Sequence, residues 1–160
     1  MKKGLFLALA VFSTTASFLP VNYANANESG ALPYISGNHN FPPNRWHVVR
    51  HTFEIKNPKN SKQISQIIIQ VPEVVRWSNN PKDIVIADGN GKKVNADVTI
   101  KDKAISLAFA EPIASNSQLE IDIKKVKRVT QGNGPVYRLF AKFDGSDTAT
   151  PIGIARFCKK

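Results

Sequence analysis

The chain has 160 residues, a formal net charge of +10 at pH 7 and a single cysteine. One cysteine excludes an intramolecular disulfide, so a hydrophobic core must hold the fold, and a chain of this length can build one. The charge favours anionic partners such as acidic polysaccharide, anionic lipid surfaces or nucleic acid, although solubility alone would also account for it. Whether Cys158 is free, oxidised or paired between chains stays open.

Residues 1–26 are predicted to be a signal peptide. Lys2 and Lys3 precede the uncharged, apolar stretch 4–12, and residues 24–26 give the A-x-A pattern that a signal peptidase accepts. The apolar stretch is too short to span a membrane, so no transmembrane segment is expected after cleavage. We therefore expect an exported protein of the periplasm, cell envelope or extracellular space. Export argues against nucleic acid as its natural partner.

Residues 27–45 are predicted to form a proline-punctuated arm. Three prolines and a glycine exclude a regular helix, and each proline biases the residue before it towards an extended conformation. We expect this arm to lie over the surface, where Tyr34, Ile35 and Phe41 could hold its later part. Residues 46–160 are then predicted to form one domain.

That domain shows the period-two alternation of apolar and polar residues that is typical of antiparallel strands. Turn residues recur between the alternating stretches, and residues 84–109 predict a three-stranded meander. With seven to nine short strands and no amphipathic helix, we expect an all-β, antiparallel, immunoglobulin-like β-sandwich in architecture, without the usual disulfide. The strands are predicted at 46–56, 64–71, 84–87, 94–101, 105–109, 119–124, 136–143 and 152–157, and 73–77 is a short strand or a helical turn.

Two strands carry more specific expectations. The stretch 64–71 is apolar on both faces and is predicted to lie centrally in a sheet. In the stretch 119–129, Val126 and Val129 fall out of phase with the preceding inward residues. Either the strand ends near Lys124 or a β-bulge shifts its phase there.

The strand and turn rhythm from His51 onward carries a family resemblance. The resembling segments are HTFEI at 51–55, IIIQVPE at 67–73, IVIADGNGKKV at 84–94, AISLAFAEPI at 104–113, LEIDIKKV at 119–126, VYRLFAKFDG at 136–145 and PIGIARF at 151–157. Together they resemble the cyanobacterial exported family known as domain of unknown function 2808 (DUF2808). The resemblance implies a secreted or periplasmic β-rich domain, and it implies no activity and no site residues.

The histidines are the natural place to seek metal chemistry. His47 and His51 share a predicted strand face, but positions four apart on a strand stand roughly 13 Å apart and cannot bind one ion. His51 lies in phase with Val49 and Phe53, which favours a hydrogen-bonded histidine in the core or at its edge. We expect no metal and no cofactor. A metal-binding protein or enzyme centred on His47, His51 and loop carboxylates is the alternative.

Catalytic motifs are missing from the sequence. There is no G-x-S-x-G elbow, and the paired carboxylates Glu120 and Asp122 fall on the outward face of a predicted strand, where we expect them to be solvated. The stretch 88–91 is followed by two lysines where a calcium loop needs oxygen ligands, so it predicts a turn. We therefore expect a protein that is not an enzyme.

The strongest charge feature is a basic run with an arginine expected on the neighbouring strand. We predict that these residues form a positive stripe that binds an anionic polysaccharide or lipid surface. The alternative is an edge strand whose lysines block edge-to-edge association, and a third possibility is a structural subunit that assembles through its edge strands. The predicted function is a non-catalytic envelope or extracellular module. The candidate binding residues are Lys124, Lys125, Lys127, Arg128 and Arg138.

Overall fold

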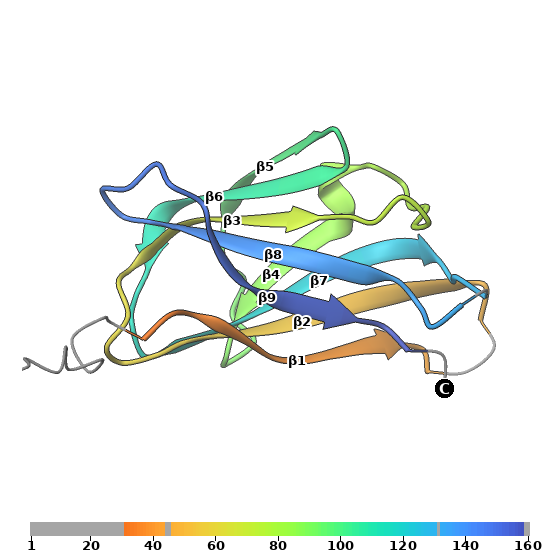
Figure 1. Cartoon of the computed structure of the whole chain (residues 1–160), viewed down its shortest axis with the longest axis horizontal. Coiled ribbons are helices and arrows are strands. Elements are labelled where there is room, and N and C mark those ends of the chain that lie inside the picture. The colour runs from red at the N-terminus through yellow and green to blue at the C-terminus, as the bar shows by residue number, and fades with distance from the viewer. Residues whose placement is uncertain (1–30, 44–45, 131, 159–160) are drawn as a thin grey trace, which may run out of the picture.

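The computed structural model describes residues 31–43, 46–130 and 132–158. The predicted signal peptide and the first residues of the arm lie outside this part of the chain. The described residues form nine strands and one short 3₁₀ helix (Figure 1). The elements are β1 (Tyr34–Phe41), β2 (Val48–Asn57), β3 (Ile64–Gln70), η1 (Pro81–Asp83), β4 (Ile84–Asp88), β5 (Ala96–Lys101), β6 (Ala104–Ile113), β7 (Ser117–Lys127), β8 (Val136–Phe143) and β9 (Thr150–Arg156).

The strands form two antiparallel sheets that enclose one core. The four-stranded sheet has the order β1-β2-β7-β4, and the five-stranded sheet has the order β5-β6-β3-β8-β9. Both sheets contribute buried side chains to a single hydrophobic cluster between them. The predicted all-β antiparallel sandwich is confirmed, and β3 lies at the centre of its sheet as expected.

Alternation along each strand decides which side chains enter that core. Val49, His51, Phe53 and Ile55 of β2 are each at most 3% exposed and face the core, whereas the residues between them lie on the opposite face of the sheet. Full burial of a side chain such as Phe53 stabilises the fold by about 1.5–3 kcal/mol. The core therefore follows directly from the period of two in the sequence.

β7 contains the β-bulge that was one of the two predicted possibilities. Its pairing with β2 shifts register between Val49 and His51, and Lys125 adopts a φ of 55° at the bulge. This shift returns Val126 to the buried face, where it is 0% exposed. The strand consequently continues to Lys127, and the cations around Val126 point away from the core.

The predicted three-stranded meander is confirmed in its second hairpin and wrong in the placement of its first strand. β4 pairs with β7, whereas β5 pairs with β6 in the other sheet. The turn at residues 88–91 is present, with Asp88 Oδ1 accepting from the backbone N–H of Asn90 and Lys92, but the chain then crosses between sheets. Alternation and turn residues identify an inward face and a reversal of direction, and neither identifies the partner strand.

Residues 34–41, which the sequence analysis placed in the arm, form β1 instead. This edge strand pairs with β2 from Tyr34 opposite Lys56 to Phe41 opposite Arg50. The prolines of the region stand just outside the strand, where no N–H is needed for the ladder. The sandwich therefore begins before residue 46.

Candidate functional site

His51 lies in the core. Its side chain is buried, its Nδ1 is 2.7 Å from the Tyr137 hydroxyl, and its ring stacks on Phe157 with centroids 4.1 Å apart. Burial, followed by the positive charge of Arg128, lowers the pKa of His51 from 6.5 to about 4. Burial also raises the pKa of Tyr137, so its hydroxyl keeps the proton that it can donate to His51. The predicted hydrogen-bonded core histidine is confirmed.

His47 does not share a site with His51. It is exposed and precedes β2, while His51 points into the sandwich. Within the described ranges, no group of three His, Cys, Asp or Glu side chains is arranged to hold a metal ion. Cys158 is an exposed free cysteine near the end of the described chain.

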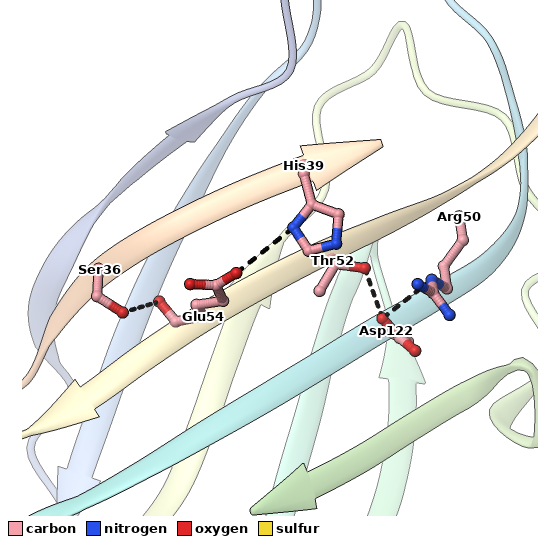
Figure 2. A network of polar contacts seen from close by, with 6 residues as sticks. All are labelled: Ser36, His39, Arg50, Thr52, Glu54 and Asp122. Atoms are coloured by element: carbon pink, nitrogen blue, oxygen red, sulfur yellow. Dashed lines mark hydrogen bonds and ion pairs between the residues drawn. The ribbon is translucent and has the colours of Figure 1, made fainter. Parts of the chain in front are cut away.

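The outer face of the four-stranded sheet carries a polar network (Figure 2). The Thr52 hydroxyl donates to Asp122 Oδ1 at 2.6 Å, and Arg50 Nε lies 3.3 Å from the same oxygen. The prediction that Asp122 is solvated is wrong: it is 8% exposed, because Thr52 stands directly opposite it on β2 and Arg50 lies against it. Glu54 lies 3.5 Å from His39 Nδ1 in the same network.

The basic run lies at one end of the sandwich, and the predicted stripe that joins it to Arg138 is wrong. Arg138 lies on β8, whose neighbours are β3 and β9 in the five-stranded sheet. The run instead ends β7, which is flanked by β2 and β4. Because β7 is an interior strand, its lysines do not serve to protect a sheet edge.

Two of the four cations in the run hold the structure together. Lys125 Nζ lies 3.0 Å from Asp83 Oδ1, and hydrogen bonds from Ser78 and then Lys125 hold the pKa of Asp83 below its usual range. Arg128 donates to the carbonyl oxygen of Trp46 at 3.1 Å and to those of two prolines at the end of β1. These two proline acceptors are Pro42 at 3.0 Å and Pro43 at 3.2 Å. Arg128 therefore clamps the connection between β1 and β2.

The other cations are available for a partner. Lys124 and Lys127 are exposed, and neither forms an ion pair with any residue that the structure describes. Arg76 is also exposed and likewise forms no ion pair with any described residue. It lies beside Lys127, because its carbonyl oxygen accepts a hydrogen bond from the Lys127 N–H at 2.8 Å. Sequence reasoning missed Arg76 as a site residue, since only this long-range bridge places it beside the run.

Carboxylates near these cations are already paired. Asp83 is engaged by Lys125, Asp122 by Arg50, and Glu73 by the ammonium group of Lys103. The surface therefore keeps an excess of positive charge. We call this surface the basic end. It comprises the three cations that form no ion pair, Arg128 and the exposed apolar residues beside them. Its members are Trp46, Val48, Val74, Arg76, Lys124, Lys127 and Arg128.

A groove of about 610 Å³ opens at the basic end. Val74, Arg76, Lys127 and Arg128 line it together with Val129. Figure 1 shows that the ends of β1 and β7, the start of β2 and the loop after β3 lie at this same end of the molecule. Of the two tryptophans, Trp77 packs against the core, whereas Trp46 is 65% exposed.

These observations define a small antiparallel β-sandwich with a positively charged end. Residues 28–133 match the family described as "Protein of unknown function (DUF2808)", and the chain belongs to this family. The predicted membership of this family is thereby confirmed, and the matched residues leave out the resembling segments at 136–145 and 151–157. No curated protein matches the chain significantly.

Solved structures show where else this fold occurs. The chain is similar to the collagen-binding domain from a Staphylococcus aureus adhesin, with a TM-score of 0.50 and 14% identity over 81% of this chain and 99% of that one. It is also similar to part of a GH20 exo-β-N-acetylglucosaminidase from Vibrio harveyi. That match has a TM-score of 0.51 and 10% identity over 81% of this chain, and it spans 19% of the enzyme. At such identities these likenesses establish the immunoglobulin-like sandwich fold. No helix in the described ranges is long and apolar enough to cross a membrane.

Proposed function

We propose that this protein is an exported, non-catalytic β-sandwich module that binds an anionic component of the cell envelope through its basic end. The observation that carries the proposal is the exposure of Arg76, Lys124 and Lys127 on one surface, while the neighbouring carboxylates are engaged by other cations. Cations left without partners on one surface attract polyanions and raise their local concentration.

Two further features support this function. The export signal predicted at residues 1–26 would place the domain where envelope polymers and lipid surfaces lie. The titratable pair with strongly shifted pKa values, His51 and Tyr137, is enclosed in the core rather than facing a groove. A substrate could not reach that pair without unfolding of the sandwich, which supports a binding role over a catalytic one.

The test is retention of the purified protein on immobilised dextran sulfate, with neutral dextran as the reference matrix. We expect retention on the sulfated matrix alone, with elution by salt, because screening at high ionic strength weakens contacts between exposed charges. The triple variant Arg76→Ala, Lys124→Ala, Lys127→Ala should elute at much lower salt than the wild type.

A matched control removes three exposed lysines from the opposite end of the sandwich. The triple variant Lys59→Ala, Lys62→Ala, Lys92→Ala loses the same formal charge but none of the basic end. We expect its elution to change far less. Equal losses in both triple variants would show that net charge rather than the basic end binds the matrix, and retention that is indifferent to salt would contradict the proposal.

A further inference from the structure

Exposed apolar side chains gather at the basic end. Trp46 is 65% exposed, Val48 is 50% exposed and Val74 is 61% exposed, although all three belong to types that usually avoid water. They come from two segments far apart in the sequence, the start of β2 and the loop after β3. Exposed apolar side chains that gather in one place mark an interaction surface.

Each of these apolar residues has a cationic neighbour. Val48 stands directly opposite Lys127 on the neighbouring strand, a position that places the two Cβ atoms about 5 Å apart. The backbone of Trp46 is held by the hydrogen bond from Arg128 to its carbonyl oxygen. Val74 lines the same groove as Arg76 and Lys127. The basic end therefore presents exposed apolar side chains next to positive charges.

This combination fits a lipid surface better than a soluble polyanion. An exposed valine offers no hydrogen bond to a sugar or sulfate group, so Val48 and Val74 would gain less from a hydrated polysaccharide chain than from a lipid surface. At a bilayer, apolar side chains enter the boundary between headgroups and acyl chains, and tryptophan favours that depth. Lysine and arginine beside them reach the anionic headgroups, so both kinds of residue find a partner.

We infer that the basic end docks on a bilayer that carries anionic headgroups. In this arrangement Arg76, Lys124 and Lys127 contact lipid phosphates, while Trp46, Val48 and Val74 enter the headgroup boundary. The inference rests on the proposed function and specifies its partner. Electrostatic attraction and apolar insertion act together, since either signal alone gives only weak, reversible attachment.

The first measurement uses the fluorescence of Trp46. The chain has two tryptophans, so the Trp77→Phe variant leaves Trp46 as the only tryptophan, whose emission can be excited selectively over that of the tyrosines. Vesicles of equal parts phosphatidylglycerol and phosphatidylcholine should shift its emission to shorter wavelength, and lipids brominated near the headgroup should quench it. Vesicles of phosphatidylcholine alone should do neither, because they offer the cations no anionic partner.

The second measurement separates lipid insertion from charge attraction. The double variant Val48→Ser, Val74→Ser should bind the anionic vesicles about tenfold more weakly, since it loses buried apolar area, yet it should keep wild-type retention on dextran sulfate. Ile154→Ser is the matched control, because Ile154 is 64% exposed and stands opposite Arg138 on the other sheet. It should leave vesicle binding unchanged.

The outcomes distinguish this inference from the proposed function. Vesicle binding without an emission shift, or vesicle binding that the two valine substitutions do not weaken, overturns the bilayer inference. The proposed binding of an anionic envelope component is then unaffected. Retention on dextran sulfate with no vesicle binding also overturns it and points to a polysaccharide. Failure to bind either probe contradicts both proposals.

Discussion

Lowering the pH should destabilise this protein through His51 in particular. The folded protein binds a proton on His51 only below a pKa of about 4, whereas the unfolded chain binds it below 6.5. Between these values the unfolded state holds more protons, so the free energy of unfolding falls as the pH falls through this window. The cause is burial of the imidazole, with the nearby Arg128 guanidinium adding to it.

The magnitude follows from the two pKa values. Each pKa unit corresponds to about 1.4 kcal/mol, and protonation of the folded state has only begun at pH 4.5. With pKa values of about 4 and 6.5, His51 should therefore remove about 2.5 kcal/mol of stability between pH 7.5 and pH 4.5. A loss of this size is a large part of the stability of an ordinary domain.

The assay is urea unfolding of the wild type and of His51→Phe across this pH range. Phenylalanine can keep the stacking on Phe157, but it leaves the Tyr137 hydroxyl without its buried partner, which should cost about 1–3 kcal/mol at neutral pH. Other groups titrate equally in both proteins, so the difference between them isolates His51. The stability advantage of the wild type should fall by about 2.5 kcal/mol between pH 7.5 and pH 4.5, and it reverses sign where it starts below that value. Parallel stability curves would refute the reasoning.

Three substitutions test other parts of the structure by urea unfolding. Phe53→Ala should cost about 3–5 kcal/mol, because the ring is fully buried between the sheets, and a cost under about 1 kcal/mol would contradict this packing. Arg128→Gln should cost about 1–3 kcal/mol and speed amide exchange in β1, since it breaks the hydrogen bonds to Pro42 and Pro43 at the end of that strand; unchanged exchange in β1 would count against the clamp. Gly134→Ala should cost about 1–3 kcal/mol, because φ is +83° and the new Cβ would overlap the Phe157 carbonyl oxygen; wild-type stability would disprove that crowding.

Alternation in the sequence predicts the inward faces of this fold well, because the side-chain period of a strand is local. The inward phase of β2 is correct for Val49, His51, Phe53 and Ile55, all of which are buried. The break in phase at Val126 also has a local cause, since a bulge inserts one residue and restores the inward position. These features depend on neighbours in the chain alone.

Strand pairing could not be predicted in the same way, because it joins distant segments. Nothing in residues 34–41 shows that they find β2, and nothing in 84–88 shows that they pair with β7 instead of with the next strand. The placement of Arg138 fails for the same reason: the turn after residue 130 suggests a hairpin with β7, yet β8 belongs to the other sheet. Each of these assignments depends on the sheet order.

The sheet order also decides which charges of the basic run are free to bind a partner. As a stretch of sequence, 124–128 offers four equivalent cations, but the fold gives them different roles. The bulge places Lys125 against Asp83, and Arg128 is held by the carbonyl oxygens of Pro42, Pro43 and Trp46. The proposed binding surface also includes Arg76 from the loop after β3. Arg128 holds the backbone of Trp46 and also lowers the pKa of His51, so a substitution of Arg128 should affect both the basic end and the titration of the core histidine.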